Sequence, residues 1–271
     1  MAVLYIFAAS DIECRPVLAQ LTRTADHKTD ENPITGKSGS NCIYLFKTGM
    51  GPEAARITVG HYLEPGTMGR FAIGIPRPDA IIVTGFAGSL SDDADEGDVV
   101  TFSSCVSEDD CASAASCSAD LLSLLLKELS KVCAVKMLTG ISSSRVAVDR
   151  QAKQSLALRG AAVVDMESYE IISAANLAAI PAAVVRVISD SRDRVLPDFN
   201  RALNRTGDFN RARLALVCLG SPIATWRLFR ASRRAQQVLS RALSVILKVD
   251  ISPAVAAESK VQPKGPGVEL R

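Results

Sequence analysis

Short apolar runs without polar alternation set the strongest limit on the fold. The clearest are AIIVTG at 80–85 and PAAVVRVIS at 181–189. A strand with one wet face alternates apolar and polar residues, whereas a strand that is covered on both faces is apolar throughout. These runs therefore predict an α/β protein in which helices cover both faces of a sheet.

Helical patterns separate the apolar runs along the chain. We expect strands at 3–9, 42–48, 80–85, 98–103, 135–141, 161–165 and 182–188. We expect helices at 13–22, 52–64, 119–132, 150–158 and 168–178, followed by a helical set toward the C-terminus. Two polar segments interrupt this order: 24–40 is Gly-rich and predicts a hairpin or loop, and 104–118 is rich in Ser, Asp and Cys and predicts a loop.

Length and composition predict the domain organisation. A chain of 271 residues is long enough to bury a sizeable core. We divide it into an α/β domain at 1–195, a helical extension packed on that domain at 196–250, and a disordered tail at 251–271. The sequence from 252 onward has the Pro, Gly and Lys content of a disordered end.

Charge and cysteine content exclude several classes of protein. The formal net charge is only +2, so we expect no nucleic-acid partner. The seven cysteines form no CxxC pair, which fits a reduced cytosol better than a disulfide framework. Cys105, Cys111 and Cys117 are evenly spaced, but no histidine lies near them, so we expect no metal site. No apolar run is long enough to span a membrane.

Two phosphate-binding motifs are incomplete. ENPITGKSGS ends like a phosphate loop, but Glu31 stands where the pattern requires Gly, and a strand-like run follows instead of a helix. TGMG and TGFAG do not complete the GxGxxG pattern of dinucleotide-binding folds. The glycines therefore indicate tight turns or close approach of the backbone to another group.

Small or acidic residues stand where five of the expected strands end. These ends carry DIE at 11–13, TGMGPEAA at 48–55, GFAGSL at 85–90, DMES at 165–168 and SDSRD at 189–193. In open α/β sheets, ligands bind outside the carboxyl ends of the strands. Five ends with glycines or carboxylates therefore predict a single site.

Three stretches resemble the nucleoside phosphorylase and nucleosidase superfamily: TGMGPEAA, VTGFAGSLSDDADEGDVV and VVDMESYEIISAANLAAIPAAVVRVISD. The resemblance covers residues 1–195, and its most specific part is a Met-Glu pair after a strand, followed by RxISD. It implies a nucleoside phosphorylase-like catalytic domain, built as a three-layer α/β/α sandwich around a central mixed sheet. It also implies a small-molecule nucleoside substrate, a homo-oligomer and no cofactor, with phosphate as a co-substrate if the enzyme is a phosphorylase.

The resemblance implies roles for the motif residues. Glu167 would accept hydrogen bonds from the ribose hydroxyls, and Met166 would pack against the sugar. Asp190 would donate a proton to the leaving purine, which gains negative charge as the N-glycosidic bond breaks. Glu13 would activate the attacking water, although a Glu in the first turn of a helix is also favoured by the helix dipole alone.

Further residues are expected to contact phosphate, water or the base. The phosphate- or water-binding candidates are Gly51, Gly85, Phe86, Ala87, Gly88 and Arg15, and the base-binding candidates are Ser189, Val146, Val164 and Asp165. Asp165 fits equally well as a helix N-cap. Phe86 stands where better-known members have a Ser that contacts phosphate, water or ribose, so hydrolysis and phosphorolysis both stay open.

The C-terminal extension predicts a basic amphipathic helix at 226–247. Its apolar residues at roughly helical spacing are Trp226, Leu228, Phe229, Val238, Leu239, Leu243, Ile246 and Leu247, and its basic residues are Arg227, Arg230, Arg233, Arg234 and Arg241. Such a helix either lies on an anionic membrane or packs on the protein as an ordinary surface helix. The first reading would bring a cytoplasmic protein to the inner face of the membrane.

The pattern LPDF…GD…SP…W…A after the last strand is similar to the hopanoid-biosynthesis-associated branch of the superfamily. That branch implies release of adenine from adenosylhopane, a nucleosyl lipid. The alternatives are a methylthioadenosine or S-adenosylhomocysteine nucleosidase, another purine or futalosine-type nucleosidase or phosphorylase, and a non-catalytic nucleoside- or lipid-binding protein. Retention of both Glu167 and Asp190 favours an enzyme, because a binder needs no acid at the base.

Overall fold

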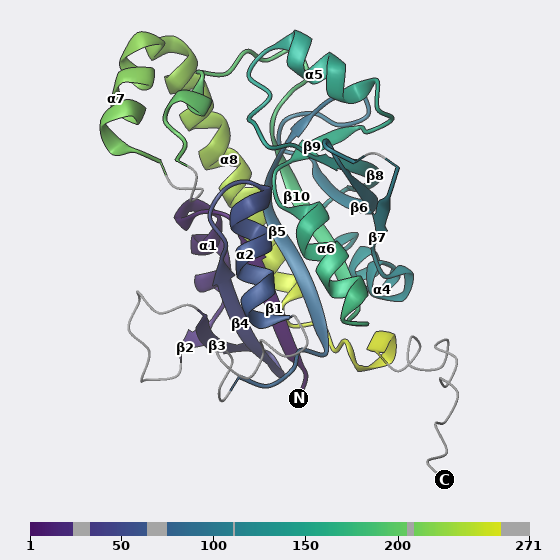
Figure 1. Ribbon diagram of the computed structural model, residues 1–271. Helices are drawn as coiled ribbons and strands as arrows, with labels where there is room; N and C mark the ends of the chain where they lie inside the picture. The colour runs from purple at the N-terminus through teal and green to yellow at the C-terminus, as the bar shows by residue number, and fades with distance from the viewer. Residues whose placement is uncertain (24–32, 64–74, 111, 205–208, 256–271) are drawn as a thin grey trace.

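The protein is built around one mixed β-sheet, which is shown with its helices in the computed structural model of Figure 1. Residues 1–23, 33–63, 75–110, 112–204 and 209–255 are described. The strands are β1 (Val3–Ala8), β2 (Thr22–Arg23), β3 (Ile34–Ser38), β4 (Asn41–Lys47), β5 (Ala80–Ser89), β6 (Val99–Ser107), β7 (Ala114–Ser116), β8 (Val135–Ser142), β9 (Val163–Asp165) and β10 (Ala182–Asp190). The seven expected strands correspond to β1, β4, β5, β6, β8, β9 and β10.

The strand order brings distant ends of the chain together. The sheet follows the order β10-β6-β8-β9-β5-β1-β4-β3-β2, and β7 pairs with β6. β5 also pairs with β10, so β5, β10, β6, β8 and β9 close a ring within the sheet. β1 is parallel to β4 and β5, and β5 is parallel to β10. β9 is antiparallel to β5, with Val164 opposite Gly88, so the ring places the end of β9 beside the carboxyl-terminal part of β5.

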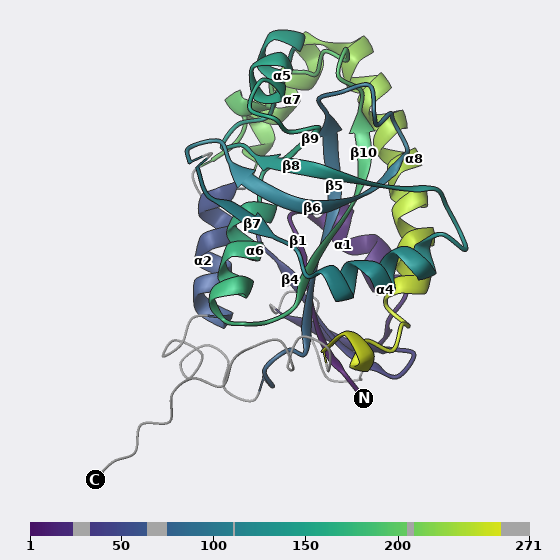
Figure 2. The same ribbon diagram turned by 90° about the vertical axis from the view of Figure 1, so that its right-hand side faces the viewer.

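Helices cover the sheet on two sides (Figures 1 and 2). They are α1 (Asp11–Leu18), α2 (Pro52–Tyr62), α4 (Ala119–Leu129), α5 (Arg150–Ala157), α6 (Ser168–Leu177), the 3₁₀ helix η1 (Phe199–Arg201), α7 (Arg211–Gly220) and α8 (Pro222–Ile246). On one side α2 packs beside α6, and on the other α1 and α4 pack beside α8 (Figure 2). The predicted α/β fold with a central mixed sheet and a C-terminal helix is confirmed.

Local sequence explains where several helices begin. Ser118 and Asp149 are the N-caps of α4 and α5, and their side chains accept hydrogen bonds from backbone N–H groups at 3.2 and 2.8 Å. Gly51 is the N-cap of α2 and has φ 97°, a conformation that favours glycine, and Pro52 follows at the first helical position. This turn fixes the backbone N–H of Gly51 just after β4.

Three segments differ from, or refine, the sequence-based expectation. β5 continues to Ser89 and β10 to Asp190, so the segment GFAG lies within a strand instead of beyond its end. The expected loop at 104–118 contains the end of β6 and all of β7, because β7 and β8 pair with this end of β6 from both sides and satisfy its backbone. In the polar segment 24–40, β3 forms an antiparallel pair with β4, whereas 24–32 lies outside the described residues.

The C-terminal helix α8 has a buried half and an exposed half. Leu239 and Leu243 are fully buried in the main core, whereas Trp226 and Phe229 are 57% and 60% exposed. Just beyond the helix, the backbone carbonyls of Leu247 and Val249 accept hydrogen bonds from the Asn41 side-chain amide, at 3.0 and 2.8 Å. The second half of the extension is therefore part of the core.

The packed structure continues past the expected start of the tail at 251. Ile251 is fully buried and Ala254 is 5% exposed, and both belong to the main core cluster. The remainder of the expected tail, 256–271, lies outside the described residues.

Among the helices of the described segments, none combines the length and the apolar composition needed to cross a bilayer.

Leu243→Ala should lower the free energy of unfolding by about 2–5 kcal/mol, because it leaves a cavity where a fully buried side chain packs. Leu216→Ala on α7 is the matched control: Leu216 is 69% exposed, and its loss should change stability by no more than about 0.5 kcal/mol. Urea unfolding followed by circular dichroism measures both variants. Equal effects would contradict the packing of α8 in the core.

Candidate active site

Arg186 is the centre of a buried cluster at the strand ends. It lies on β10 and is 1% exposed, although its neighbours in the strand are apolar. Its Nη2 lies 2.8 Å from Asp165 Oδ2 and 3.3 Å from Glu167 Oε2, and its Nη1 lies 3.7 Å from Glu13 Oε1. A buried charge is tolerated only when it is paired, so this guanidinium ties three carboxylates from two separate parts of the chain to one strand.

Glu13 is buried in the first turn of α1, and both of its carboxylate oxygens have partners. Oε2 accepts hydrogen bonds from Ser10 N at 2.9 Å and from Ala9 N at 3.1 Å, in a capping box that fixes the side chain at the helix N-terminus. Oε1 accepts a hydrogen bond from the backbone N–H of Phe86 at 2.8 Å. The backbone of the expected residue Phe86 is therefore brought to the cluster, and Oε1 faces β5 and Arg186.

Two glycines of β5 make room for carboxylates. Gly85 has φ 144°, and a Cβ there would overlap both Glu13 Oε1 and Arg186 Nη1. A Cβ at Gly88 would lie 3.1 Å from Asp190 Oδ2. The expected residues Gly85 and Gly88 are therefore part of the site, and β5 passes between Glu13 on one side and Asp190 on the other.

Glu167 joins the cluster to the start of α2. Its Oε1 accepts a hydrogen bond from Gly51 N at 2.9 Å, and its Oε2 accepts one from Arg186 Nη2 at 3.3 Å. Burial raises the pKa of Glu167 to about 8; Asp165 and Glu13 act in the same direction, and Arg186 and the Gly51 N–H oppose it. A protonated Glu167 can donate a hydrogen bond as well as accept one.

Asp165 supports the cluster from within the fold. Its Oδ1 accepts hydrogen bonds from Ser142 Oγ at 2.6 Å and from Ser168 N at 3.3 Å. Its Oδ2 accepts hydrogen bonds from Ser168 Oγ and from Arg186 Nε, the latter at 3.1 Å. Because these bonds occupy both oxygens, Asp165 has no acceptor left for a base. It supplies a capping acceptor to the first turn of α6, whose N-cap position is Glu167.

Asp190 is paired with a buried lysine. Lys153 on α5 is 1% exposed; its Nζ donates a hydrogen bond to Asp190 Oδ2 and another to Ser191 O at 2.6 Å. The hydroxyl of Ser189 lies 2.7 Å from Asp190 Oδ1 and 3.3 Å from Ala87 O. Each oxygen of Asp190 thus has a donor beside it, and Ser189 and Ala87, both expected site residues, lie at this end of β10.

Val146 has its backbone groups paired with a side-chain amide. Val146 N donates a hydrogen bond to Asn200 Oδ1 at 2.8 Å, and Asn200 Nδ2 donates one to Val146 O at 3.0 Å. An amide presents one donor and one acceptor side by side, as does the edge of an adenine ring. A base that used these two backbone groups would have to displace Asn200.

Of the remaining expected site residues, Met166 and Val164 lie at the cluster, and Arg15 lies outside it. Met166 and Val164 are buried, and the Met166 methyl would lie 3.8 Å from a Cβ placed on Gly51. Arg15 is exposed. It follows Glu13 by two residues, which turns it about 200° around α1 to the side away from the cluster. The expectation that Arg15 contacts phosphate at this site therefore finds no support in its position.

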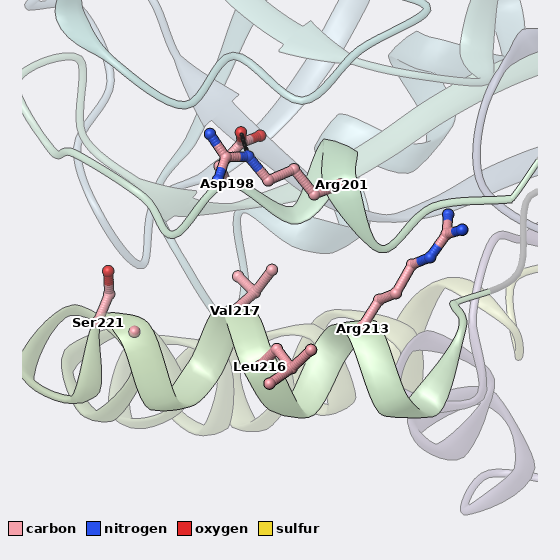
Figure 3. A pocket seen from close by; sticks show the side chains of 7 residues that line it. Asp198, Arg201, Arg213, Leu216, Val217 and Ser221 are labelled. Carbon is pink, nitrogen blue, oxygen red and sulfur yellow. Dashed lines mark ion pairs between the residues drawn. The ribbon is translucent and has the colours of Figure 1, made fainter.

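A cavity of about 490 Å³ lies apart from the cluster, between η1 and α7 (Figure 3). Its lining comprises Asp198, Arg201, Arg213, Leu216, Val217, Gly220 and Ser221. The ion pair between Asp198 and Arg201, at 2.9 Å, forms one side. This volume suits a small ligand. No residue of the carboxylate cluster lines the cavity, however, so we place the candidate active site at the cluster and not at this cavity.

No metal site emerges within the described part of the chain, where no group of three or more His, Cys, Asp or Glu is arranged to hold an ion. The acidic side chains of the cluster are instead directed at Arg186. Cys105 and Cys117 are buried free cysteines, and Cys111 lies outside the described residues.

Comparison with known proteins identifies the family. The sequence profile of the Phosphorylase superfamily matches residues 4–214. The chain therefore belongs to the Phosphorylase superfamily, and it is an enzyme of the nucleosidase or nucleoside phosphorylase class. No curated protein sequence matches it significantly.

Solved structures share the fold at low sequence identity. The 5′-methylthioadenosine/S-adenosylhomocysteine nucleosidase of Neisseria meningitidis has a TM-score of 0.69 at 15% identity, covering 92% of this chain and 99% of that one. Futalosine hydrolase of Helicobacter pylori has a TM-score of 0.67 at 17% identity, covering 95% and 98%. The H. pylori 5′-methylthioadenosine/S-adenosylhomocysteine nucleosidase has a TM-score of 0.67 at 17% identity, covering 89% and 96%. These similarities establish the fold.

Three polar residues of the site have no assigned role in the sequence analysis. Arg186 carries a readable signal, because a lone charge in the apolar run AAVVRVIS needs carboxylate partners if the strand is buried. Lys153 lies in an ordinary polar helix, and Asn200 lies in the short 3₁₀ helix η1. No local pattern distinguishes either from a solvated surface residue.

The raised pKa of Glu167 should make stability depend on pH. The folded protein keeps this proton up to about pH 8, whereas the unfolded chain releases it near the usual pKa of 4.5. The stability that Glu167 contributes is therefore fully present below its unfolded pKa and is lost as the pH rises through its folded pKa. Glu167→Gln cannot ionise, so its unfolding temperature should rise relative to the wild type between about pH 4.5 and pH 8. Parallel curves in differential scanning fluorimetry would contradict this.

Proposed function

We propose that the protein breaks the N-glycosidic bond of a 5′-substituted adenosine and releases adenine. The observation that carries the proposal is the arrangement of three buried carboxylates, Glu13, Glu167 and Asp190, along β5 at the ends of three other strands. Membership of the Phosphorylase superfamily supports the class of reaction. The structurally similar methylthioadenosine/S-adenosylhomocysteine nucleosidases support an adenine nucleoside as substrate.

Asp190 acts as the acid that protonates the leaving base. In the reactive state of this proposal Asp190 holds a proton; cleavage moves the bonding electrons onto the purine, and the proton passes from Asp190 to the base and neutralises the charge that develops there. The carboxylate that remains is stabilised by the ammonium of Lys153 and by the hydroxyl of Ser189. The pair of Asp190 and Lys153 thus accommodates the loss of a proton inside a buried site.

Glu167 holds the ribose. The Gly51 N–H and Arg186 fix the orientation of its carboxyl group, which leaves the remaining lone pairs and its proton for the ribose hydroxyls. Met166, the preceding residue, supplies an apolar surface for the sugar. The nearby carboxylates stabilise the positive charge that develops on the ribose as the bond breaks.

Glu13 activates water as the nucleophile. Its Oε1 is held by the Phe86 N–H and faces Arg186, so a water at this oxygen would pass its proton to the carboxylate as it attacks the sugar. Even with Glu167 protonated, the carboxylates of Glu13 and Asp165 share the single guanidinium of Arg186, and this excess of negative groups disfavours an anionic phosphate relative to water. We therefore propose hydrolysis.

A nucleosyl lipid, adenosylhopane, is the first candidate for the substrate. Support comes from the C-terminal pattern LPDF…SP…W and from Phe86, which stands in place of the Ser of better-known members and would make a neighbouring pocket more apolar. Methylthioadenosine or S-adenosylhomocysteine is the second candidate, supported by the names of the similar solved structures. Both candidates share the adenosine chemistry and differ in the 5′ group.

Adenine release, measured by chromatography, should separate these candidates. The assay offers methylthioadenosine and, in detergent, adenosylhopane, each with and without phosphate. We expect adenine from the hopane without a requirement for phosphate. Release from methylthioadenosine alone would select the second candidate, dependence on phosphate would indicate a phosphorylase, and adenine binding without release from either substrate would indicate a non-catalytic binder.

Asp190→Asn should lower kcat by at least about 100-fold with a smaller change in KM, because an amide cannot donate an acidic proton to the base. Steady-state adenine release on the better substrate measures this. Near-normal turnover would contradict the acid role.

A second variant separates this catalytic loss from a loss of stability. Asp190→Asn leaves Lys153 buried without its carboxylate, a situation that costs about 3–5 kcal/mol. The double variant Asp190→Asn/Lys153→Met removes the unpaired charge and should recover thermal stability without recovering activity. Recovered activity in the double variant would show that Asp190 serves only to balance Lys153.

The oligomeric state of the protein and its place in the cell stay predictions. We propose a homo-oligomer in the cytoplasm that needs no metal or organic cofactor. Light scattering of the purified protein and activity in the presence of a chelator measure the oligomeric state and the metal requirement.

A further inference from the structure

The apolar residues of α8 change from one side of the helix to the other along its length. In the second half, Leu239 and Leu243 are fully buried in the core. In the first half, Ile223, Trp226 and Phe229 are 69%, 57% and 60% exposed. At about 100° per residue, these three side chains fall within an arc of about 120° that is turned away from the core-facing side. Packing on the core therefore explains the second half of the helix and leaves the first half unexplained.

Helix α7 adds to this exposed apolar area. Leu216 and Leu219 are 69% and 76% exposed, and α7 is joined to α8 at Ser221. In Figure 1, α7 and the beginning of α8 form a corner that projects from the body of the protein. We define the α7–α8 surface as Leu216, Leu219, Ile223, Trp226 and Phe229 with Arg227, Arg230, Arg233 and Arg234. Exposed apolar groups gathered on one projecting corner are typical of an interaction surface.

The α7–α8 surface is basic as well as apolar. The sequence from 209 to 249 contains no Asp or Glu. The Arg230 guanidinium lies 4.9 Å from the centroid of the Trp226 ring, and the Arg233 guanidinium lies 5.8 Å from the centroid of the Phe229 ring. These cation–π contacts keep positive charge and aromatic surface on the same side of the helix.

A basic cavity opens beside these aromatic residues. It has a volume of about 290 Å³ and is lined by Glu96, Arg194, Trp226, Arg227, Arg230, Ala231 and Arg234. Glu96 is already paired with Arg194 at 2.6 Å, so the three arginines of α8 meet no further carboxylate in the lining. Guanidinium groups bind phosphate in a bidentate manner, so this cavity suits the phosphate of a lipid headgroup.

We propose that the α7–α8 surface docks on an anionic lipid bilayer. Trp226, Phe229 and the exposed aliphatic side chains enter the interfacial layer, and the arginines bind headgroup phosphates. A second copy of the chain is a poorer occupant, because a symmetric contact would bring the same arginines face to face. A nucleic acid would use the arginines but would leave the exposed leucines and Ile223 without apolar partners.

Docking would also bring the candidate site close to the bilayer. Glu96, which lines the basic cavity, lies 3.4 Å from the backbone N–H of Ser191, which donates a hydrogen bond to it. Ser191 directly follows Asp190, so the cavity and the acid of the site are adjacent at the end of β10. The inference does not depend on the proposed function, although a nucleosyl lipid substrate would be found at the same bilayer.

Vesicle flotation with the full-length protein tests the proposal. The probes are vesicles of phosphatidylcholine alone and vesicles in which about one-third of the lipid is phosphatidylglycerol. We expect binding only to the anionic vesicles, with weaker binding at high salt. Trp226→Ser/Phe229→Ser should weaken partitioning at least about tenfold, because it removes the inserted rings. Arg227→Gln/Arg230→Gln should weaken it roughly fivefold per arginine.

Matched variants on other faces serve as controls. Leu158→Ser/Leu177→Ser changes two side chains that are 84% and 87% exposed, and Lys37→Gln/Lys127→Gln removes two exposed charges; both should bind like the wild type. Thermal unfolding verifies that every variant is folded. Equal binding to both vesicle types, or equal binding by surface and control variants, would overturn the proposal. Self-association that Trp226→Ser/Phe229→Ser abolishes, without vesicle binding, would also overturn it. The assay contains no substrate, so its outcome is independent of adenine release.

Discussion

The buried guanidinium of Arg186 is the interaction on which the candidate site depends. It contacts carboxylates from the first turn of α1 and from both sides of the junction between β9 and α6, all within 3.7 Å. Removing a charge from water is costly unless it is paired, so these segments cannot separate without leaving an unpaired charge in the interior. Gly85 completes the arrangement, because any larger residue would occupy the space where Glu13 and Arg186 meet β5.

The same burial divides the acidic residues into two environments. Glu167 shares one arginine with two other carboxylates, and its pKa is raised to about 8, chiefly by burial. Asp190 has a lysine of its own and a serine on its other oxygen. Carboxyl groups that differ in their partners are suited to different tasks, as in other enzymes that use paired carboxylates. The proposed division between holding the ribose and protonating the base follows from this difference.

Helix α8 connects the core to the proposed membrane surface. Over its 25 residues it changes from an exposed, basic and aromatic segment to a segment that packs beside β10 and has Leu239, Leu243 and Ile246 fully buried. The buried half fixes the direction of the exposed half, because both belong to one continuous, stiff α-helix. A surface held in this way can dock without first folding, which avoids the entropy cost of ordering a flexible segment.

Sequence alone was sufficient for the fold class and for most of the strand ends, because apolar runs and helical periodicity are local patterns. Motif residues such as Glu167 and Asp190 were proposed from sequence, through a resemblance that depends on short stretches. The pairing of Lys153 with Asp190, of Asn200 with Val146 and of Arg186 with three carboxylates was decided only by the tertiary structure. These pairs depend on which strands become neighbours and on the register between them. The closing of β5 onto β10 and β9 sets both, and no local pattern contains that information.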